Sequence, residues 1–349
     1  MQGLILAAGE STRLRPLTLG VPKPLIYILG KTLIDYSIEK LREFKIKEIG
    51  IVIGYLGKLI KEYLETKYKE KFYFVEQKER LGIANAIYLA IENGFIKEPF
   101  VTYLSDNLFI ENFDSIREEL EKFDVFVVLC KVKDPYRFGV AVIEDHRIKK
   151  LVEKPKEKIS EYALTGIYYF RDPDLVKKAY SYLKPSNRGE YEITELIQWF
   201  IDRGYSVGYK ITEKWWKDVG TKESLLDAVR FLLDKNEIEN IEEENIKGRV
   251  IIDEKAEVYG KVYGPAYIGK NVIIEKDAII YPYTSIEENS KIISGKIQFS
   301  LIQPNVLADV KEFIITNSII GNNSRLIAKN SLYAREISAF ISAYSEIIL

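Results

Sequence analysis

The chain has 349 residues, and 30% of them are charged, yet the net charge at neutral pH is only −1. A chain of this length is expected to form two domains, each large enough to bury its own core. The balanced charge excludes the basic excess with which proteins wrap nucleic acid or attach to an anionic membrane.

Strand-like and helix-like segments alternate over residues 1–235, which we expect to form the first domain. The expected strands cover residues 4–6, 48–53, 72–76, 100–104 and 125–130, and the expected helices cover 33–44, 56–68, 83–93 and 221–235. This alternation predicts an α/β fold, with a Rossmann-like, mostly parallel sheet between two layers of helices. Ligands of such sheets bind beyond the carboxyl ends of the strands. Short strands and turns over 134–165 predict an insertion that caps the ligand cleft.

The remainder of the chain has a different periodicity. Residues 236–247 are acidic and weakly amphipathic, which is typical of a linker. Aliphatic residues then recur at every sixth position, first as Ile268, Ile274, Ile280, Ile286 and Ile292 and later as Ile314, Ile320, Leu326 and Leu332. A period of six predicts a parallel β-helix over residues 248–349, in which each aliphatic residue points inward and stacks on the residue one coil away. A β-sandwich with fortuitous spacing is the alternative.

The scarcity of cysteine and histidine, and the absence of a long apolar segment, exclude several kinds of functional site and disfavour a membrane location. Cys130 is the single cysteine and His146 the single histidine, so an internal disulfide, a zinc site and Cys-His catalysis are excluded. We expect Cys130 to be a small core residue and His146 to lie in a solvated turn. No window of 18 apolar residues occurs and no cleavable leader precedes the first strand, so we expect a soluble, cytoplasmic protein.

The most informative segment is LILAAGESTRLRPLTLGVPKPL, residues 4–25. An apolar strand leads into small residues, which let a polyphosphate approach the backbone N–H groups, while Arg13 and Lys23 supply positive charge. A strand-glycine-helix turn without phosphate is the alternative reading. The sequence Gly-Lys-Thr at 30–32 is not a P-loop, because Leu25 stands where that motif requires glycine.

The string LxAGxxTRLxPLT…KPL resembles the signature loop of the sugar-phosphate nucleotidyltransferases. The resemblance implies that Arg13 and Lys23 are the catalytic groups, which neutralise the triphosphate and the leaving pyrophosphate. Further along the chain, residues 77–84 resemble the family's base-reading string Q-x-x-x-L-G-x-A. By this resemblance Gln77 hydrogen-bonds the Watson–Crick edge of a pyrimidine and Gly82 lets the base lie against the backbone. The full set of nucleotide-binding residues implied is Leu6, Ala8, Gly9, Ser11, Thr12, Gln77, Gly82 and Asp106.

Two carboxylates follow strand-like segments. Asp106 stands at the carboxyl end of a buried strand, where an unpaired carboxylate is costly unless it binds a metal. Asp218 ends the string W-W-K-D before a helix. Together with phosphate oxygens, the two residues make an octahedral Mg²⁺ site, and Mg²⁺ is the cofactor we expect. An N-cap role is the alternative for Asp218.

The sugar-binding side is implied by short strings that match the family in order, F-G-V, E-K-P, T-G-x-Y and R-G-E-x-E-I-T. By this resemblance Glu153 holds sugar hydroxyls, Lys154 contacts the sugar phosphate, and Gly139 and Gly166 open room for the hexose. Thr165 and Trp216 complete the expected sugar-phosphate site. From composition alone, Glu153 and Lys154 would be read as a solvated charge pair.

These strings cover residues 4–221, and the tail resembles the left-handed β-helix found on many nucleotidyltransferases. The whole chain resembles the long form of the glucose-1-phosphate thymidylyltransferase family, which implies transfer from dTTP to glucose 1-phosphate with release of pyrophosphate. A uridylyltransferase that uses UTP, or an enzyme of broad specificity, is the alternative. An acyltransferase is disfavoured because no histidine follows His146. A non-catalytic regulatory homologue is disfavoured because the loop cations and both carboxylates are present. The tail leaves a homo-oligomer open without fixing a stoichiometry.

Overall fold

The computed structural model describes residues 1–235, 238–329 and 335–349. The chain forms two compact units. The first contains residues 1–10 and 34–218, and the second contains residues 11–33 and 219–349. This division differs from the domain boundaries expected from the sequence, because residues 11–33 belong with the C-terminal part of the chain.

The first unit is built on a mixed nine-stranded sheet with the order β10-β9-β11-β6-β1-β4-β5, to which β8 and β12 are added beside β11. Its central strand β1 (Gln2–Ala7) is buried throughout and pairs in parallel with β4 (Ile49–Ile53) and β6 (Phe100–Leu104). The remaining strands are β5 (Tyr73–Glu76), β8 (Val125–Lys131), β9 (Gly139–Glu144), β10 (Arg147–Glu153), β11 (Tyr162–Phe170) and β12 (Val207–Thr212).

Helices pack on both faces of this sheet. The helices are α1 (Leu33–Glu43), α2 (Gly57–Lys67), α3 (Ile83–Glu92), α4 (Arg117–Leu120), α5 (Pro173–Tyr180) and α6 (Ile193–Asp202). Leu4 and Leu6 share one core with apolar side chains of α3 and α6. On the opposite face, a Cβ added to Gly3 would lie 2.9 Å from Leu41 of α1, as expected from the alternation of side chains along a strand. The predicted Rossmann-like α/β fold is confirmed.

Most predicted elements agree with the structure. Strand β6 has the predicted bounds, and α3 ends at Glu92, one residue before the predicted end. Residues 134–165 do contain short strands and turns, and β9, β10 and β11 extend the main sheet. His146 is exposed in the turn between β9 and β10, whereas Cys130 is half-buried in β8, where burial raises the pKa of its thiol. Within the described ranges, no helix combines the length and the apolar character needed to cross a membrane.

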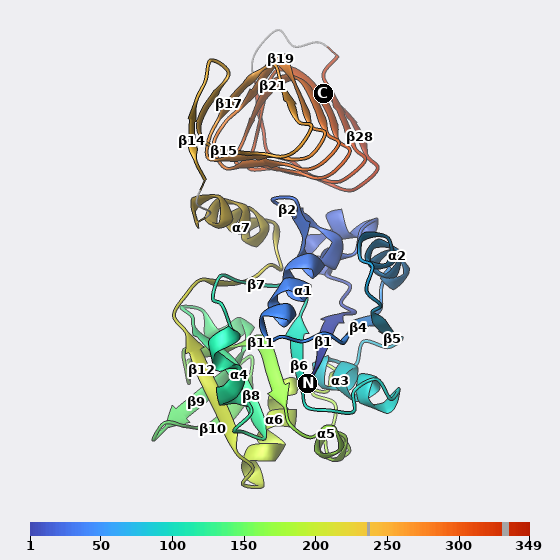
Figure 1. The fold of residues 1–349 in the computed structure, drawn as a ribbon, viewed down its shortest axis with the longest axis vertical. Coiled ribbons are helices and arrows are strands. Elements are labelled where there is room, and N and C mark those ends of the chain that lie inside the picture. Colours follow the sequence, from blue (N-terminus) through green and yellow to red (C-terminus); the bar gives the residue numbers. More distant parts are fainter. Residues whose placement is uncertain (236–237, 330–334) are drawn as a thin grey trace. The chain divides into compact units, whose positions relative to one another are not determined.

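The second unit is dominated by a parallel β-helix, whose three-sided coils are seen end-on in Figure 1. Its strands are β15 (Ile246–Ile252), β16 (Glu257–Val258), β17 (Lys261–Tyr263), β18 (Ala266–Ile268), β19 (Ile273–Ile280), β20 (Thr284–Ile286), β21 (Lys291–Gln298), β22 (Leu301–Ile302), β23 (Leu307–Thr316), β24 (Ile319–Ile320), β25 (Arg325–Ile327), β26 (Glu336–Ile337), β27 (Phe340–Ile341) and β28 (Glu346–Ile348). Ile268 pairs with Ile286 and Ile274 with Ile292, one coil apart. The expected left-handed β-helix is therefore confirmed as the fold of the tail.

Two positions of the hexapeptide pattern do not follow the expectation or cannot be compared with it, Ile314 and Leu332. The inward position expected for Ile314 is taken by Ile315, which is 1% exposed, while Ile314 is half-buried. The shift arises in the irregular stretch before it, where the register between β21 and β23 changes. Leu332, which was also expected to point inward, lies outside the described residues.

The segment expected as a linker contains regular structure. After α7 (Lys222–Lys235), β14 (Asn240–Glu242) pairs antiparallel with the first residues of β15. Acidic composition therefore coexists here with a hairpin, because exposed side chains on an edge strand do not disturb its backbone ladder.

Residues 11–33 of the second unit form three single-turn 3₁₀ helices and a hairpin. The helices are η1 (Thr12–Leu14), η2 (Leu17–Leu19) and η3 (Lys23–Leu25), and the hairpin pairs β2 (Tyr27–Ile28) with β3 (Lys31–Thr32). Its apolar side chains, Leu14, Leu17, Ile26 and Ile28, are almost completely buried. We call residues 11–33 the N-terminal segment.

Candidate active site

The predicted site in the first unit lies at the carboxyl ends of the parallel strands. The chain leaves β1 toward β4 on one side and later returns to β6 on the other, which makes this end of β1 a topological switch point. The backbone N–H of Ser105 donates to the carbonyl of Leu6 at 3.2 Å. The loop after β1 packs tightly as well, since a Cβ on Gly54 would lie 2.7 Å from the carbonyl oxygen of Ala8.

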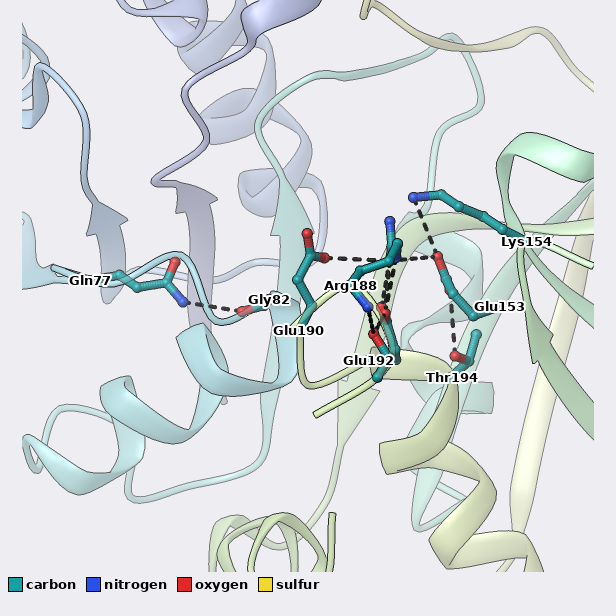
Figure 2. A network of polar contacts seen from close by, with 9 residues as sticks. Gln77, Gly82, Glu153, Lys154, Arg188, Glu190, Glu192 and Thr194 are labelled. Carbon is teal, nitrogen blue, oxygen red and sulfur yellow. Dashed lines mark hydrogen bonds and ion pairs between the residues drawn. The ribbon is translucent and has the colours of Figure 1, made fainter. Parts of the chain in front are cut away.

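Gln77, the predicted base-reading residue, follows β5 and is held in one orientation. Its amide nitrogen donates to the carbonyl of Gly82 at 3.1 Å, as Figure 2 shows, and to Oδ1 of Asn85 at 2.9 Å. Both amide hydrogens are thereby used, so the carbonyl oxygen is the part of this amide that is left to read a ligand. Gly82 has a φ of 93°, and a Cβ there would lie 2.7 Å from the carbonyl oxygen of Tyr191.

Asn85 on α3 fixes the orientation of Gln77 and was not identified from the sequence. Its own amide nitrogen donates to the hydroxyl of Tyr180 at 2.8 Å. The ring of Tyr180 stacks on Tyr88, with centroids 4.3 Å apart. Asn85 directly follows the Q-x-x-x-L-G-x-A string, one turn before Tyr88 on the same helix, and this spacing is the signal that could have pointed to it.

The two predicted metal ligands are brought together by a short strand pair. Strand β7 (Asn107–Phe109) runs antiparallel to β13 (Trp216–Asp218), and Asn107 lies opposite Asp218. Asp106, which precedes β7, accepts a hydrogen bond from the Asn107 amide at 2.8 Å. Both carboxylates are half-buried. The described residues contain no group of three or more His, Cys, Asp or Glu side chains arranged for a metal ion, so the two predicted ligands do not belong to a larger cluster of such side chains.

Trp216 contacts residues on both the predicted metal-binding side and the predicted sugar-binding side. Its indole N–H donates to Oδ1 of Asn107 at 2.6 Å. Its ring meets Phe138 edge-on, with centroids 5.4 Å apart. Phe138 precedes Gly139, one of the residues expected beside the hexose. Trp216 therefore supports Asn107 through its polar edge and the start of β9 through its ring.

Glu153 and Lys154 belong to a network of charges (Figure 2). Glu153 lies 3.7 Å from the Lys154 ammonium and 3.3 Å from the Arg188 guanidinium, and it accepts from Thr194 at 3.4 Å. Arg188 also binds both carboxylate oxygens of the buried Glu192 at 2.8 Å. The sequence placed the R-G-E-x-E-I-T string at the border of the pocket, but the role of Glu192 in fixing Arg188 was missed.

Burial and neighbouring charges shift the pKa values of two groups in this region, Glu153 and Tyr168. Burial, and next the charge of Glu192, raises the pKa of Glu153, while Lys154 and Arg188 oppose the shift. Burial also raises the pKa of Tyr168, with the charges of Glu153 and Asp106 adding to the shift. A carboxylate of the predicted metal pair and a carboxylate of the predicted sugar side thus act on the same tyrosine.

Three small residues shape the space around these groups. A Cβ on Gly139 would lie 2.5 Å from Thr194 and 3.0 Å from Oε2 of Glu153. Gly166 has a φ of 94°, and a Cβ there would lie 2.9 Å from Nδ2 of Asn107. Thr165 is buried and donates its hydroxyl to the carbonyl of Val128 at 2.8 Å. In the structure, therefore, the glycines make room for Glu153 and Asn107, and Thr165 anchors the strand.

The loop that follows β1 divides between the two units. Leu6, Ala8 and Gly9 belong to the first unit, and Ser11, Thr12, Arg13 and Lys23 belong to the second. Within the first unit, Glu10 forms an ion pair with Arg80 of the base-reading segment. Within the second, the hydroxyl of Thr18 donates to the carbonyl of Ser11 at 3.1 Å. Arg13 is exposed, whereas Lys23 is buried.

Known proteins resemble the chain over nearly all of its length. The family model for nucleotidyl transferases matches residues 2–235. A glucose-1-phosphate thymidylyltransferase of Streptomyces antibioticus is 31% identical, over 98% of this chain and 97% of its own length. The structure of a putative glucose-1-phosphate thymidylyltransferase from Bacillus anthracis, in complex with a sucrose, is 36% identical with a TM-score of 0.60, and the match covers 68% of this chain and 96% of that one. A UDP-glucose pyrophosphorylase complexed with UDP-glucose is 26% identical with a TM-score of 0.61, over 67% and 99%.

Proposed function

The chain belongs to the nucleotidyl transferase family, and from that premise we propose that it joins glucose 1-phosphate to dTTP, giving dTDP-glucose and pyrophosphate. A phosphate oxygen of the sugar phosphate attacks the α-phosphorus, and the bond to the pyrophosphate breaks. The attacking group is already an anion at neutral pH, so no general base is needed, in agreement with a chain that has one histidine, in an exposed turn.

The observation that carries this proposal is that three kinds of group lie at the ends of strands in the same unit. The oriented amide of Gln77 follows β5, Asp106 follows β6, and Asp218 and Glu153 are the last residues of β13 and β10. These are the three requirements of nucleotidyl transfer to a sugar phosphate: recognition of a base, charge neutralisation of phosphates, and recognition of a sugar phosphate.

The orientation of Gln77 supports a base with an N–H donor on its Watson–Crick edge. The carbonyl oxygen left by the bonds to Gly82 and Asn85 accepts a hydrogen bond but donates none. Uracil and thymine offer an N–H at N3, whereas cytosine offers an acceptor there. The amide therefore favours dTTP or UTP over CTP.

The residues at β7 and β13 fit Mg²⁺. This ion prefers oxygen ligands and is usually held by one or two carboxylates together with substrate phosphates. Asp106 and Asp218, on paired strands, supply such a donor set. When bound, Mg²⁺ would neutralise phosphate charge and favour departure of the pyrophosphate. Asn107, hydrogen-bonded to Asp106 and to Trp216, would keep the Asp106 carboxylate oriented.

The cations have separate roles in this proposal. Arg13 and Lys23 neutralise the triphosphate and the leaving pyrophosphate. Lys154 contacts the phosphate of the sugar, while Glu153 accepts hydrogen bonds from sugar hydroxyls. Arg188, held by Glu192, keeps Glu153 in place. Because the pKa of Glu153 is raised, its carboxylate becomes protonated at a higher pH than that of an ordinary glutamate. As the pH falls, Glu153 therefore stops accepting hydrogen bonds as a carboxylate sooner than an ordinary glutamate would.

Uridylyl transfer is the second candidate, and the same amide supports it, because uracil and thymine share the edge that Gln77 would read. The two triphosphates differ by a methyl group and a 2′-hydroxyl, and a single methyl group allows only about 10- to 200-fold discrimination. The choice between them therefore depends on contacts to the ribose and to the methyl group.

Mass spectrometry of the products tests the proposal. The full chain is incubated with Mg²⁺, glucose 1-phosphate and an equimolar mixture of dTTP, UTP, CTP, ATP and GTP. We expect dTDP-glucose as the main nucleotide sugar. A predominance of UDP-glucose would favour the second candidate, and the absence of any nucleotide sugar would contradict both.

A further inference from the structure

The hairpin of the N-terminal segment is bound by a buried carboxylate of the β-helix. Glu287 directly follows β20, and its side chain is fully buried. Its Oε1 accepts from the backbone N–H of Leu29 at 3.0 Å, and its Oε2 accepts from that of Gly30 at 2.8 Å. The hydroxyl of Ser285 donates to the same Oε1 at 2.6 Å. A carboxylate is the side chain that offers enough acceptor sites for these three donors.

A second side chain of the β-helix binds the strand before the turn. Gln303 follows β22, and its amide accepts from the backbone N–H of Tyr27 at 3.0 Å and donates to the carbonyl of Tyr27 at 2.9 Å. The Gln303 amide thereby pairs with both backbone groups of Tyr27, as the backbone of a neighbouring strand would. We call Glu287 and Gln303 the clamp.

The turn held by the clamp has a conformation that needs support. Leu29 has a φ of 49°, in the left-handed region that a leucine rarely adopts. Gly30 has a φ of 79°, and a Cβ there would collide with the hydroxyl of Tyr267 on β18. The β-helix therefore stabilises the turn in two ways, since it binds both N–H groups and packs against Gly30.

The clamped turn is connected directly to Lys23. The backbone N–H of Ile26 donates to the carbonyl of Lys23 at 3.0 Å, and that of Leu33 donates to the carbonyl of Ile26 at 3.1 Å. Tyr27, which Gln303 binds, is the next residue after Ile26. Displacement of the hairpin would thus be transmitted to Lys23 through a single turn of backbone.

We propose that Glu287 and Gln303 are positioning residues for triphosphate binding: the β-helix holds the N-terminal segment in the conformation in which Lys23 meets the triphosphate. The proposal gives the tail a task in the reaction, and it rests on the proposed function for what Lys23 binds. It predicts that damage to the clamp weakens binding of the triphosphate while binding of the sugar phosphate is unaffected.

The charge of Glu287 makes the clamp sensitive to pH. Burial is the main cause that raises its pKa to about 7, and Asp253 adds to the shift, while the bonds from Ser285, Gly30 and Leu29 oppose it. Other ionisable groups on this side include Tyr267, which donates to Asp253, and Glu288, which accepts from the hydroxyl of Tyr27 at 3.3 Å. Because the pKa is higher in the closed clamp than for a carboxyl exposed to water, this shift stabilises the clamp below about pH 7, and the contribution is lost as the pH rises. A glutamine at this position is uncharged at every pH and adds no such pH dependence.

Hydrogen exchange and steady-state kinetics of the full chain test the proposal in wild type, Glu287→Gln and Gln303→Leu. Ser318→Ala is the matched control, because Ser318 is a buried serine of the β-helix whose hydroxyl bonds to Thr316 at 2.7 Å and to Ala339 at 2.8 Å. At pH 8 we expect amides of residues 23–33 to exchange about tenfold faster or more in both clamp variants, because Glu287→Gln loses one charge-assisted hydrogen bond and Gln303→Leu loses two neutral ones. The KM for the triphosphate should rise about as much, with the KM for glucose 1-phosphate unchanged.

The pH series separates positioning from general damage. After correction for intrinsic exchange rates, amides of residues 23–33 in wild type should exchange more slowly at pH 6 than at pH 8, whereas Glu287→Gln should show no such dependence on pH. Unchanged exchange at residues 23–33 in both clamp variants, an equal effect in Ser318→Ala, or faster exchange without a change in the KM for the triphosphate would each overturn the proposal. If wild type releases no pyrophosphate with any triphosphate, the proposed function fails, and the exchange data still decide whether the clamp orders the segment.

Discussion

Replacement of Asn85 by leucine should relax the choice of base. In the wild type, Gln77 has two hydrogen bonds that fix its amide, to Gly82 at 3.1 Å and to Asn85 at 2.9 Å. Rotation of the amide by half a turn would present a donor to cytosine, but it would break both bonds. In Asn85→Leu, the same rotation breaks only the bond to Gly82.

The size of the effect follows from the one bond that is lost. A neutral hydrogen bond contributes about 1 kcal/mol to stability, and this corresponds to about a fivefold change in an equilibrium constant at room temperature. We therefore expect the preference for dTTP or UTP over CTP to fall about fivefold in Asn85→Leu. The fall should come mainly from a gain with CTP, because Gln77 in its wild-type orientation remains available to uracil and thymine.

The assay is the ratio of kcat/KM for the preferred triphosphate to that for CTP, measured by release of pyrophosphate. Asn85→Asp is the matched control, since a carboxylate still accepts from the Gln77 amide, and the Tyr180 hydroxyl can then act as the donor. We expect the control to retain the wild-type ratio. An unchanged ratio in Asn85→Leu, with the fold intact by circular dichroism, would refute the reasoning about the orientation of Gln77.

Three further predictions concern the remaining groups. Lys23→Ala or Asp106→Asn should lower kcat by about 10²- to 10³-fold, as for loss of a preorganised charge-stabilising group, and turnover at saturating substrates with circular dichroism as a control checks this. The raised pKa of Glu153 contributes stability at acid pH that is lost as the pH rises, so the melting temperature of Glu153→Gln should increase relative to that of wild type as the pH rises above the ordinary glutamate value of 4.5; a constant difference would contradict the shift. Gly166→Ala should cost about 1–3 kcal/mol in urea unfolding, because φ is 94° and the Cβ would press on Asn107; an unchanged midpoint would show that the turn adapts.

Much of the fold could be predicted from the sequence because periodicity reports burial directly. The apolar runs gave β1 and β6, and the sixfold repeat of isoleucines gave the β-helix with pairs such as Ile268 and Ile286. The repeat failed at Ile314, where a change of register between β21 and β23 turns Ile315 inward instead. A bulge of this kind depends on backbone geometry and leaves no mark in the spacing of apolar residues.

The candidate site was predicted less completely. Motif resemblance pointed to Gln77, Asp106, Asp218 and Glu153 as candidates, because each stands in a string that matches the family. It did not identify Asn85, which orients Gln77, because a helical asparagine has many structural uses. The assignment of residues 11–33 to the unit of the β-helix also could not be foreseen. That association depends on Glu287 and Gln303, far away in the chain, and pairing between distant residues is not encoded in local patterns.

Release of pyrophosphate by the purified full chain with Mg²⁺, glucose 1-phosphate and dTTP tests the central claim most directly. We expect pyrophosphate to be released only when both substrates are present, so that omission of glucose 1-phosphate abolishes the release. One dTDP-glucose should form for each pyrophosphate released. The same release without the sugar phosphate would indicate hydrolysis of the triphosphate. No release with dTTP or UTP, from a chain that is folded by circular dichroism, would contradict the assignment of nucleotidyl transfer to this site.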